Sequence, residues 1–176
     1  MSQASFPFYQ AIPAKLKSPK AIRQVKVMVQ TLKEVSKPYG AMQAPTQLAD
    51  FWRREVASAD WFDPEKEHLV VVCLDAKLKL KAFNVVSIGL NNQTLLHARE
   101  VFRPAISVAA AHVVIIHNHP SGDPSPSSDD VRITRQMVKA GEVLGIPCLD
   151  SVIVGQPDQR NPSGFVSMKQ AGLVEF

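Results

Sequence analysis

Two histidines and an aspartate near the middle of the sequence have residue types and a spacing that could bind one metal ion. His117 and His119 are two residues apart at the end of the apolar run VVIIH, and Asp130 follows a loop rich in proline, glycine and serine. Side chains two residues apart on an extended strand project to the same side, so both imidazoles could reach one ion. Asp130, in the first turn of a following helix, would face back to the strand end and supply a third ligand.

Ser127 and Asp130 are spaced as Ser-x-x-Asp, and this spacing has two compatible explanations. In the first, Ser127 caps a helix by accepting a hydrogen bond from a first-turn amide, and the acid lies near the positive end of the helix dipole. In the second, Asp130 is a metal ligand and Ser127 directs its hydroxyl into the same pocket. Prolines in the preceding loop fix φ and favour one preset path, and Asn118 and Asp123 are predicted to shape that loop.

The surrounding segments alternate between strand patterns and helix patterns. The run VVIIH contains no polar residue before its histidine and predicts a central strand that is covered on both faces. Helices are predicted over 99–112, with Pro104 in the first turn, and within the segment 129–146, where the helix ends at Gly145 before Pro147. Further strands are predicted over 68–75, 79–89, 91–98, 148–155 and 165–167, the first three as a meander. This mixture predicts a single three-layer α/β/α domain with a mixed central sheet.

The N-terminal third of the chain is predicted to have two parts. Residues 1–20 contain several prolines and little periodicity, which predicts an extended or flexible basic leader. Residues 21–64 are predicted to contain a strand over 22–32, where valines alternate with polar residues, and a helix over 47–57 behind Thr46 as a cap.

The overall composition is that of an ordinary globular protein. The chain has 176 residues, of which 45% are hydrophobic and 20% are charged, which suits one domain. It contains neither a secretory signal pattern nor a run of about 20 apolar residues, so we expect a cytoplasmic protein without a membrane span. Cys73 and Cys148 lie among aliphatic neighbours and are predicted to be reduced thiols in the core.

Positive charge is concentrated at the start of the chain. Residues 1–37 contain 7 lysines and arginines against the single acid Glu34. Such a segment could lie along phosphates, which makes nucleic acid a candidate partner, or it could be a solvated lead-in. Neither interleaved aromatic residues nor a DNA-binding motif accompany it. The sequence does not indicate the oligomeric state.

The residues from His117 to Asp130 resemble a known signature. The pair His117 and His119, seven further residues, Ser127, two residues and Asp130 match the His-x-His-x7-Ser-x2-Asp pattern of the JAMM (JAB/MPN) metallopeptidase-like domains. The form HNHPSGDPSPS is similar to the RadC branch of that superfamily, and the similarity extends through EHLVVVCLD, REVFRPAI, DSVIVG and FVSM over residues 65–176. The resemblance implies a JAB/MPN fold, similar to that of cytidine deaminases. A helix-hairpin-helix module, which many RadC proteins carry, is not apparent.

The resemblance also implies a cofactor and a reaction. His117, His119 and Asp130 would bind zinc, and water would fill the fourth position, where its pKa falls to about 7. Ser127 would stabilise the oxyanion of a tetrahedral intermediate. The implied activity is that of a zinc metalloprotease that hydrolyses a peptide or isopeptide bond in a protein or peptide substrate.

A general base is needed to take a proton from the attacking water. In the family this base is a glutamate at the start of an earlier strand, and Glu67 occupies that place directly before HLVVVCLD. By residue type alone, Glu65 and Glu100 qualify as well. Glu100 has another explanation, because it would be a favourable charge in the first turn of its predicted helix.

Three other functions share some features with these residues. In HNH nucleases the named residues are spread through a ββα-metal unit, so the adjacent letters HNH are a coincidence. A zinc deaminase is excluded because Pro-Cys-x-x-Cys is absent. A non-catalytic or nuclease-like module that acts at DNA in repair or recombination stays an alternative, since intact chemistry does not name a substrate.

Overall fold

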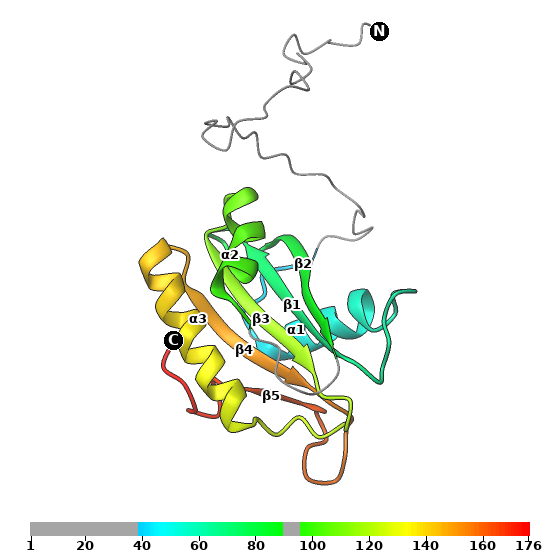
Figure 1. Ribbon diagram of the computed structural model, residues 1–176. Coiled ribbons are helices and arrows are strands. Elements are labelled where there is room, and N and C mark those ends of the chain that lie inside the picture. The colour runs from blue at the N-terminus through cyan, green and yellow to red at the C-terminus, as the bar shows by residue number, and fades with distance from the viewer. Residues whose placement is uncertain (1–38, 90–95) are drawn as a thin grey trace, which may run out of the picture.

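The computed structural model describes residues 39–89 and 96–176 and contains a five-stranded mixed sheet (Figure 1). The strands lie in the order β2-β1-β3-β4-β5. β3 and β4 are parallel, and the other neighbouring pairs are antiparallel. The strands have the bounds β1 Glu67–Leu74, β2 Leu80–Gly89, β3 His112–Asn118, β4 Cys148–Val154 and β5 Phe165–Ser167. β3, which contains VVIIH, is the central strand, as predicted.

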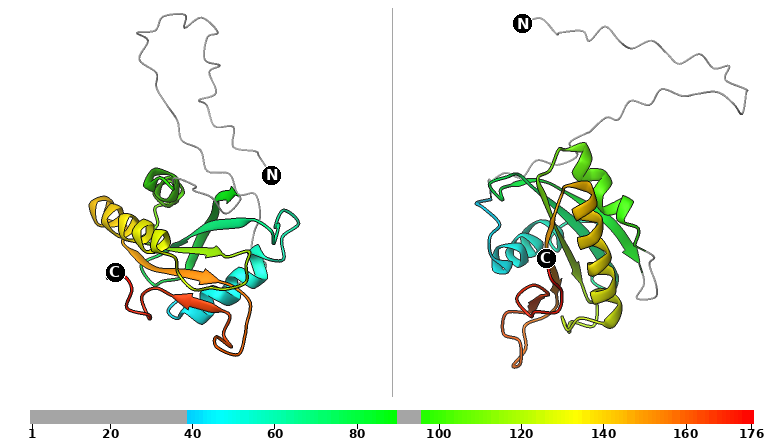
Figure 2. Two further views of the ribbon diagram at one scale, coloured as in Figure 1. Left: turned by 60° about the horizontal axis from the view of Figure 1, so that its bottom comes forward. Right: turned by 90° about the vertical axis from the view of Figure 1, so that its left-hand side faces the viewer.

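Helices cover both faces of the sheet, so the domain has three layers (Figure 2). On one face lie α1 (Pro45–Phe51) and the π-helical turn η1 (Trp52–Val56) that continues it. On the other face lie α2 (Ala98–Ser107) and α3 (Ser128–Leu144), and α3 connects the parallel strands β3 and β4. The predicted α/β/α fold class is therefore confirmed. Across the described ranges, every helix lacks the length or the apolar character needed to traverse a bilayer.

Alternate residues of the central strands face the two helical layers. Val70 of β1 and Ile116 of β3 pack in the core beneath α1 and η1. Val71 and Ile115 pack in a second core on the opposite face, beneath α2 and α3. All four are at most 3% exposed, so both faces of the central strands are closed to water. The same alternation carries His117 to the side of α2 and α3, because it lies two residues after Ile115.

Helix α1 begins earlier than predicted and has a different cap. Thr46 lies inside the helix, which starts at Pro45 after Ala44, so the predicted cap is wrong. The Gln47 side chain accepts hydrogen bonds through Oε1 from the backbone N–H groups of Gln43 at 2.8 Å and Ala44 at 2.9 Å. Pro45, the first helical residue, has no N–H that needs a partner. The Gln47 side chain can therefore bond the N–H groups of the two residues before the proline.

Helix α2 also differs from its prediction. Pro104 lies in the second half of the helix and not in the first turn, and the helix ends before the predicted residue 112. A proline inside a helix removes one backbone hydrogen bond and costs about 3 kcal/mol. Val101, Phe102 and Ala105 are buried against the sheet, and burial of the larger side chains, at about 1.5–3 kcal/mol each, offsets that cost.

Three predicted features lie wholly or partly outside the described residues. The leader over 1–20 and the strand over 22–32 both precede residue 39. Of the third strand of the predicted meander, residues 96–98 are described. Leu96 and His97 do not belong to a strand, and Ala98 begins α2. The prediction of a strand is wrong at these residues, because the chain enters α2 here and the buried residues of α2 recur at helical spacing.

The two cysteines yield a testable prediction about the core. Cys73 and Cys148 are free and buried on the face covered by α2 and α3, as predicted. Burial raises the pKa of Cys73 to about 11 and that of Cys148 to about 12. We expect neither thiol to react with Ellman's reagent in the native protein and both to react in guanidinium, because the thiolate is the reactive form. A thiol that reacted in the native protein as fast as free cysteine would contradict this packing.

Candidate metal centre

The carboxyl end of β3 holds both histidines. His117 is 4% exposed and pairs with Leu69 of β1 and Ile153 of β4. His119 lies just past the strand, where its backbone N–H donates to the Val154 carbonyl at 3.1 Å. The two imidazole rings have their centroids 5.1 Å apart. The two side chains therefore lie in one region, as their spacing predicted.

The first turn of α3 supplies the carboxylate. Ser127 is the residue that caps the helix, and its Oγ accepts a hydrogen bond from the Asp130 N–H at 3.1 Å. In return, Asp130 Oδ2 accepts from the Ser127 N–H at 2.8 Å and from the Ser127 hydroxyl at 2.6 Å. The capping explanation of Ser127 and Asp130 is therefore confirmed. It also fixes the direction of the carboxylate, which points toward β3.

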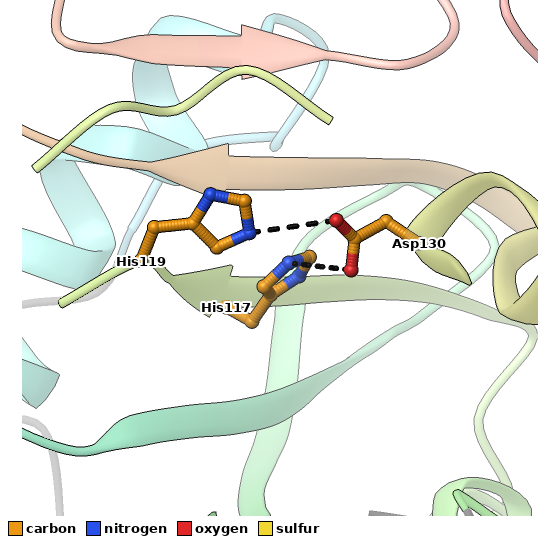
Figure 3. Close-up of side chains that lie close together, drawn as sticks. All are labelled: His117, His119 and Asp130. Atoms are coloured by element: carbon orange, nitrogen blue, oxygen red, sulfur yellow. Dashed lines mark ion pairs between the residues drawn. The ribbon is translucent and has the colours of Figure 1, made fainter. Parts of the chain in front are cut away.

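The Asp130 carboxylate faces both imidazoles (Figure 3). Oδ1 lies 3.3 Å from His117 Nε2, and Oδ2 lies 3.5 Å from His119 Nε2. Ligand atoms from all three residues lie within 4.8 Å of one another. Around a tetrahedral zinc with bonds of about 2.0–2.1 Å, neighbouring ligand atoms are about 3.3–3.4 Å apart. Each nitrogen–oxygen distance is close to this separation, although the two distances involve different carboxylate oxygens. With all ligand atoms within 4.8 Å of one another, the three residues are a candidate site for one such ion.

The hydrogen bonds of the histidines also fit a metal site. Both ring nitrogens of His117 are buried, and neither makes a hydrogen bond. Buried polar atoms without a partner are rare in proteins, and an ion bound at Nε2, the nitrogen that faces Asp130, would account for that one of the two. His119 Nδ1 lies 2.8 Å from the backbone carbonyl of Asp123, and a proton on Nδ1 leaves Nε2 with a free lone pair. Metal-binding histidines usually have such a second partner, which fixes the ring orientation and the tautomer.

The charges within the cluster stabilise one another. Burial alone would raise the pKa of Asp130, but His117, His119 and Ser127 outweigh it and hold the pKa of this carboxyl well below its usual range. The Asp130 carboxylate in turn raises the pKa of His119, against the effect of burial. Asp130 is therefore an anion at neutral pH, which is the form that binds a cation.

A close contact between two loops supports the histidines. Gly122 has a φ of +82°, and its carbonyl accepts a hydrogen bond from the Gln156 N–H at 2.7 Å. A Cβ on Gly155 would overlap Gly122 O and lie 2.8 Å from Pro124 Cδ, so only glycine fits at this position. Sequence reasoning missed Gly155. Its only signal is a glycine directly after the apolar strand β4.

Glu67 begins β1 on the same side of the sheet as the histidines. Leu69 pairs with His117, and Glu67 lies two residues before Leu69, so its side chain projects to the same face. Glu67 is half-buried, and its charge contributes to the raised pKa of His119. The structure thus brings this predicted base near the cluster, while its role stays a prediction.

The two other glutamates have different surroundings. Glu65 is exposed and lies in the turn before β1, where its N–H donates to Asp63 Oδ1 at 3.0 Å. Glu100 lies in the first turn of α2, and its carboxylate forms ion pairs with Arg99 at 3.2 Å and Arg103 at 2.7 Å. These neighbours agree with the structural explanation of Glu100 as a first-turn charge.

Asn118 was predicted to shape the loop, but the structure places it in a strand. It is the last residue of β3, only 7% exposed, and its side chain bonds the backbone next to Glu67. Asp123, the other residue that was predicted to shape the loop, does so, because its Oδ1 accepts a hydrogen bond from the Ser125 N–H at 2.9 Å. Sequence reasoning could not see the Asn118 contacts, because they join segments about fifty residues apart.

A mixed sheet between helical layers, with a His-His-Asp cluster at the end of its central strand, is consistent with a JAB-type α/β domain. The chain matches the RadC-like JAB domain family over residues 42–173 and therefore belongs to that family. The match begins ahead of β1, so it includes α1 and η1, which pack against the same sheet.

Similar proteins include UPF0758 proteins of bacteria and archaea. The chain is 35% identical over 169 residues to one from Desulforamulus reducens, across 94% of this chain and 72% of that protein. It is 46% identical over 111 residues to one from Caldanaerobacter subterraneus subsp. tengcongensis, across 63% and 45%. It is 44% identical over 112 residues to one from Methanosarcina barkeri, across 64% and 46%. The chain spans about half the length of most of the curated relatives it matches.

The contact at Gly155 yields a prediction in which a change in zinc affinity can be distinguished from a change in overall stability. We expect Gly155→Ala to lower zinc affinity roughly tenfold or more, because an added methyl group pushes the loop that holds His119. Gly40→Ala is the matched control, since a Cβ at Gly40 meets nothing within 4 Å. Calorimetric titration with zinc and thermal unfolding of both variants provide the measurement. Equal zinc affinity in the two variants would contradict the supporting role of this contact.

Proposed function

We propose that this domain is a zinc-dependent hydrolase of a peptide or isopeptide bond in a protein or peptide substrate. His117, His119 and Asp130 would hold the ion, and Glu67 would act as the general base. Membership in the JAB domain family supports this proposal, because that superfamily includes metallopeptidases. The single observation that carries it is the buried His117 imidazole, which has no hydrogen-bond partner and faces an anionic carboxylate.

The chain offers the donors that a catalytic zinc ion requires. Two imidazole nitrogens and one carboxylate are three protein ligands, which leave a fourth position open. When bound, zinc supplies a Lewis acid that makes water a nucleophile near neutral pH. Glu67, on the same side of the sheet, would accept the proton of the attacking water and pass it to the leaving amine.

Ser127 would have two successive roles. Its hydroxyl has one proton, which it donates to Asp130 Oδ2 at 2.6 Å. This bond orients the carboxylate toward the histidines. We propose that the same hydroxyl turns to the substrate oxyanion when a substrate is bound, because one proton cannot serve both acceptors at once.

The metal site can be tested without a substrate. We expect purified protein to bind about one zinc ion per chain and His119→Ala or Asp130→Ala to abolish this binding, because each substitution leaves only two protein ligands. Elemental analysis after zinc loading and desalting provides the measurement. Asp129→Ala is the matched control and should retain zinc, because Asp129 is an exposed acid next to Asp130 whose carboxylate pairs with Arg132. Failure of the wild type to bind zinc under native and zinc-supplemented conditions would refute the metal site.

The general base can be tested with substitutions that keep the shape of the side chain. We expect Glu67→Gln to retain zinc and to lose about 10²–10⁴-fold in hydrolysis, because the amide cannot accept the proton. Glu65→Gln and Glu100→Gln are controls that should keep most of the activity. A panel of peptides, isopeptide-linked peptides and DNA, assayed with each zinc-loaded protein, provides the measurement. Loss of activity in Glu100→Gln alone would assign the base to α2.

The same panel addresses the alternative of a DNA-associated module. If the protein hydrolyses nothing, binds DNA with a steep dependence on salt and loses this binding when residues 1–37 are removed, the hydrolase proposal is wrong. The basic segment would then be the partner-binding element.

A further inference from the structure

We propose that Asn118 is a positioning residue that sets the place of Glu67 relative to the two histidines. This inference rests on the proposed function, in which Glu67 is the base. Asn118 does not face the ion itself, because it lies between His117 and His119 and its side chain points along the sheet toward β1.

The backbone pairing of β1 and β3 stops before it reaches Glu67. The last pair of residues is Leu69 and His117. Beyond that pair, β3 follows β4, and the His119 N–H bonds the Val154 carbonyl. In a continued ladder the next hydrogen-bonded pair would be His68 and Asn118, and Glu67 would lie opposite His119 as a non-hydrogen-bonded pair. The His68 N–H bonds the Asn118 side chain instead of its backbone carbonyl. On its other side, Glu67 pairs with Gly89, the last residue of β2.

The Asn118 side chain bridges the two strands where the ladder has stopped. Its Oδ1 accepts from the His68 N–H at 2.8 Å, and its Nδ2 donates to the Lys66 carbonyl at 3.1 Å. These two groups belong to the peptide units on either side of Glu67. A side-chain amide that holds both units fixes the backbone of Glu67, and hence the direction in which its carboxylate leaves β1.

The bridge requires an amide of this length. It needs one acceptor and one donor on the same planar group, which asparagine supplies and aspartate does not. An aspartate at position 118 could still accept from the His68 N–H but would place a charged oxygen against the Lys66 carbonyl. Because Asn118 is 7% exposed, water cannot easily replace the lost donor.

Asn118 lies between the two histidines in the chain, so the bridge that its side chain forms links the histidines to Glu67. Its backbone determines where His117 and His119 leave β3, and its side chain determines where Glu67 leaves β1. One residue thus relates the base to the metal ligands across two strands. A displacement of about 1 Å between a catalytic base and the ligands of the metal can lower a catalysed rate roughly 10²-fold.

The contact can be tested in metal-free protein by amide hydrogen exchange. We expect the His68 N–H to be protected in the wild type and to exchange about tenfold faster or more in Asn118→Ala, because its acceptor is lost. In Asn118→Asp the acceptor remains, so this amide should stay protected. Asn84→Ala is the matched control, since Asn84 is exposed on β2 and bonds only its neighbour's carbonyl. Unchanged exchange of the His68 amide in Asn118→Ala would overturn the inference.

The consequence for catalysis needs zinc-loaded protein and a substrate that the wild type hydrolyses. We expect Asn118→Ala and Asn118→Asp to bind zinc as the wild type does, with kcat lower by roughly 10²-fold and KM within about twofold. The double variant Asn118→Ala/Glu67→Gln should be no slower than Glu67→Gln, because Asn118 acts through Glu67. Additive losses in the double variant would indicate general disruption and overturn the inference, as would loss of zinc in Asn118→Ala.

The two proposals fail in different ways. If Glu67→Gln abolishes hydrolysis while Asn118→Ala and Asn118→Asp keep the wild-type kcat, the positioning role alone is wrong. If Glu67→Gln leaves hydrolysis unchanged in zinc-loaded protein, the proposed general base is wrong and the role of Asn118 falls with it.

Discussion

The enclosure of β3 is the constraint on which the candidate site depends. This strand is hydrogen-bonded to β1 on one side and to β4 on the other, and helices cover its apolar residues on both faces. A strand held in this way cannot shift without breaking two ladders and opening two cores. His117, at its end, is therefore held in place before any ligand arrives. Burial of an imidazole without hydrogen-bond partners is costly, and the packing of the two cores holds the His117 ring in this position despite that cost.

The parts of the site that follow local rules could be predicted from the sequence. Strand alternation relates His117 to His119, and helix capping relates Ser127 to Asp130. Each relation holds within a few residues of chain, so it does not depend on how distant segments meet. The central strand was predictable for a similar reason, because a run without polar residues fits only a position covered on both faces. The resemblance to a known signature then related the two local patterns to each other and to Glu67.

Features that depend on contacts between distant segments could not be predicted. Gly155 must be glycine because Gly122 and Pro124 approach it from another loop, and the glycine after β4 does not by itself indicate which segment approaches it. Asn118 looks like a loop residue until β1 is placed beside it. Pro104 shows the same limit for a helix, because burial of its neighbours against the sheet overrides the preference of proline for a first turn. In each case tertiary packing decided between local alternatives.

The candidate site therefore combines a rigid part with a part that needs adjustment. The three residues of the candidate metal site lie on one continuous segment, where β3, the proline-containing loop and the capped start of α3 fix their relative positions. Glu67 comes from another strand, and the backbone ladder that would fix its distance from His119 is absent at that point. In the proposed function, Glu67 must lie within hydrogen-bond reach of the attacking water, so its position relative to the histidines matters. An amide side chain at the last residue of β3 joins the two strands at this point, because it bonds the backbone on both sides of Glu67.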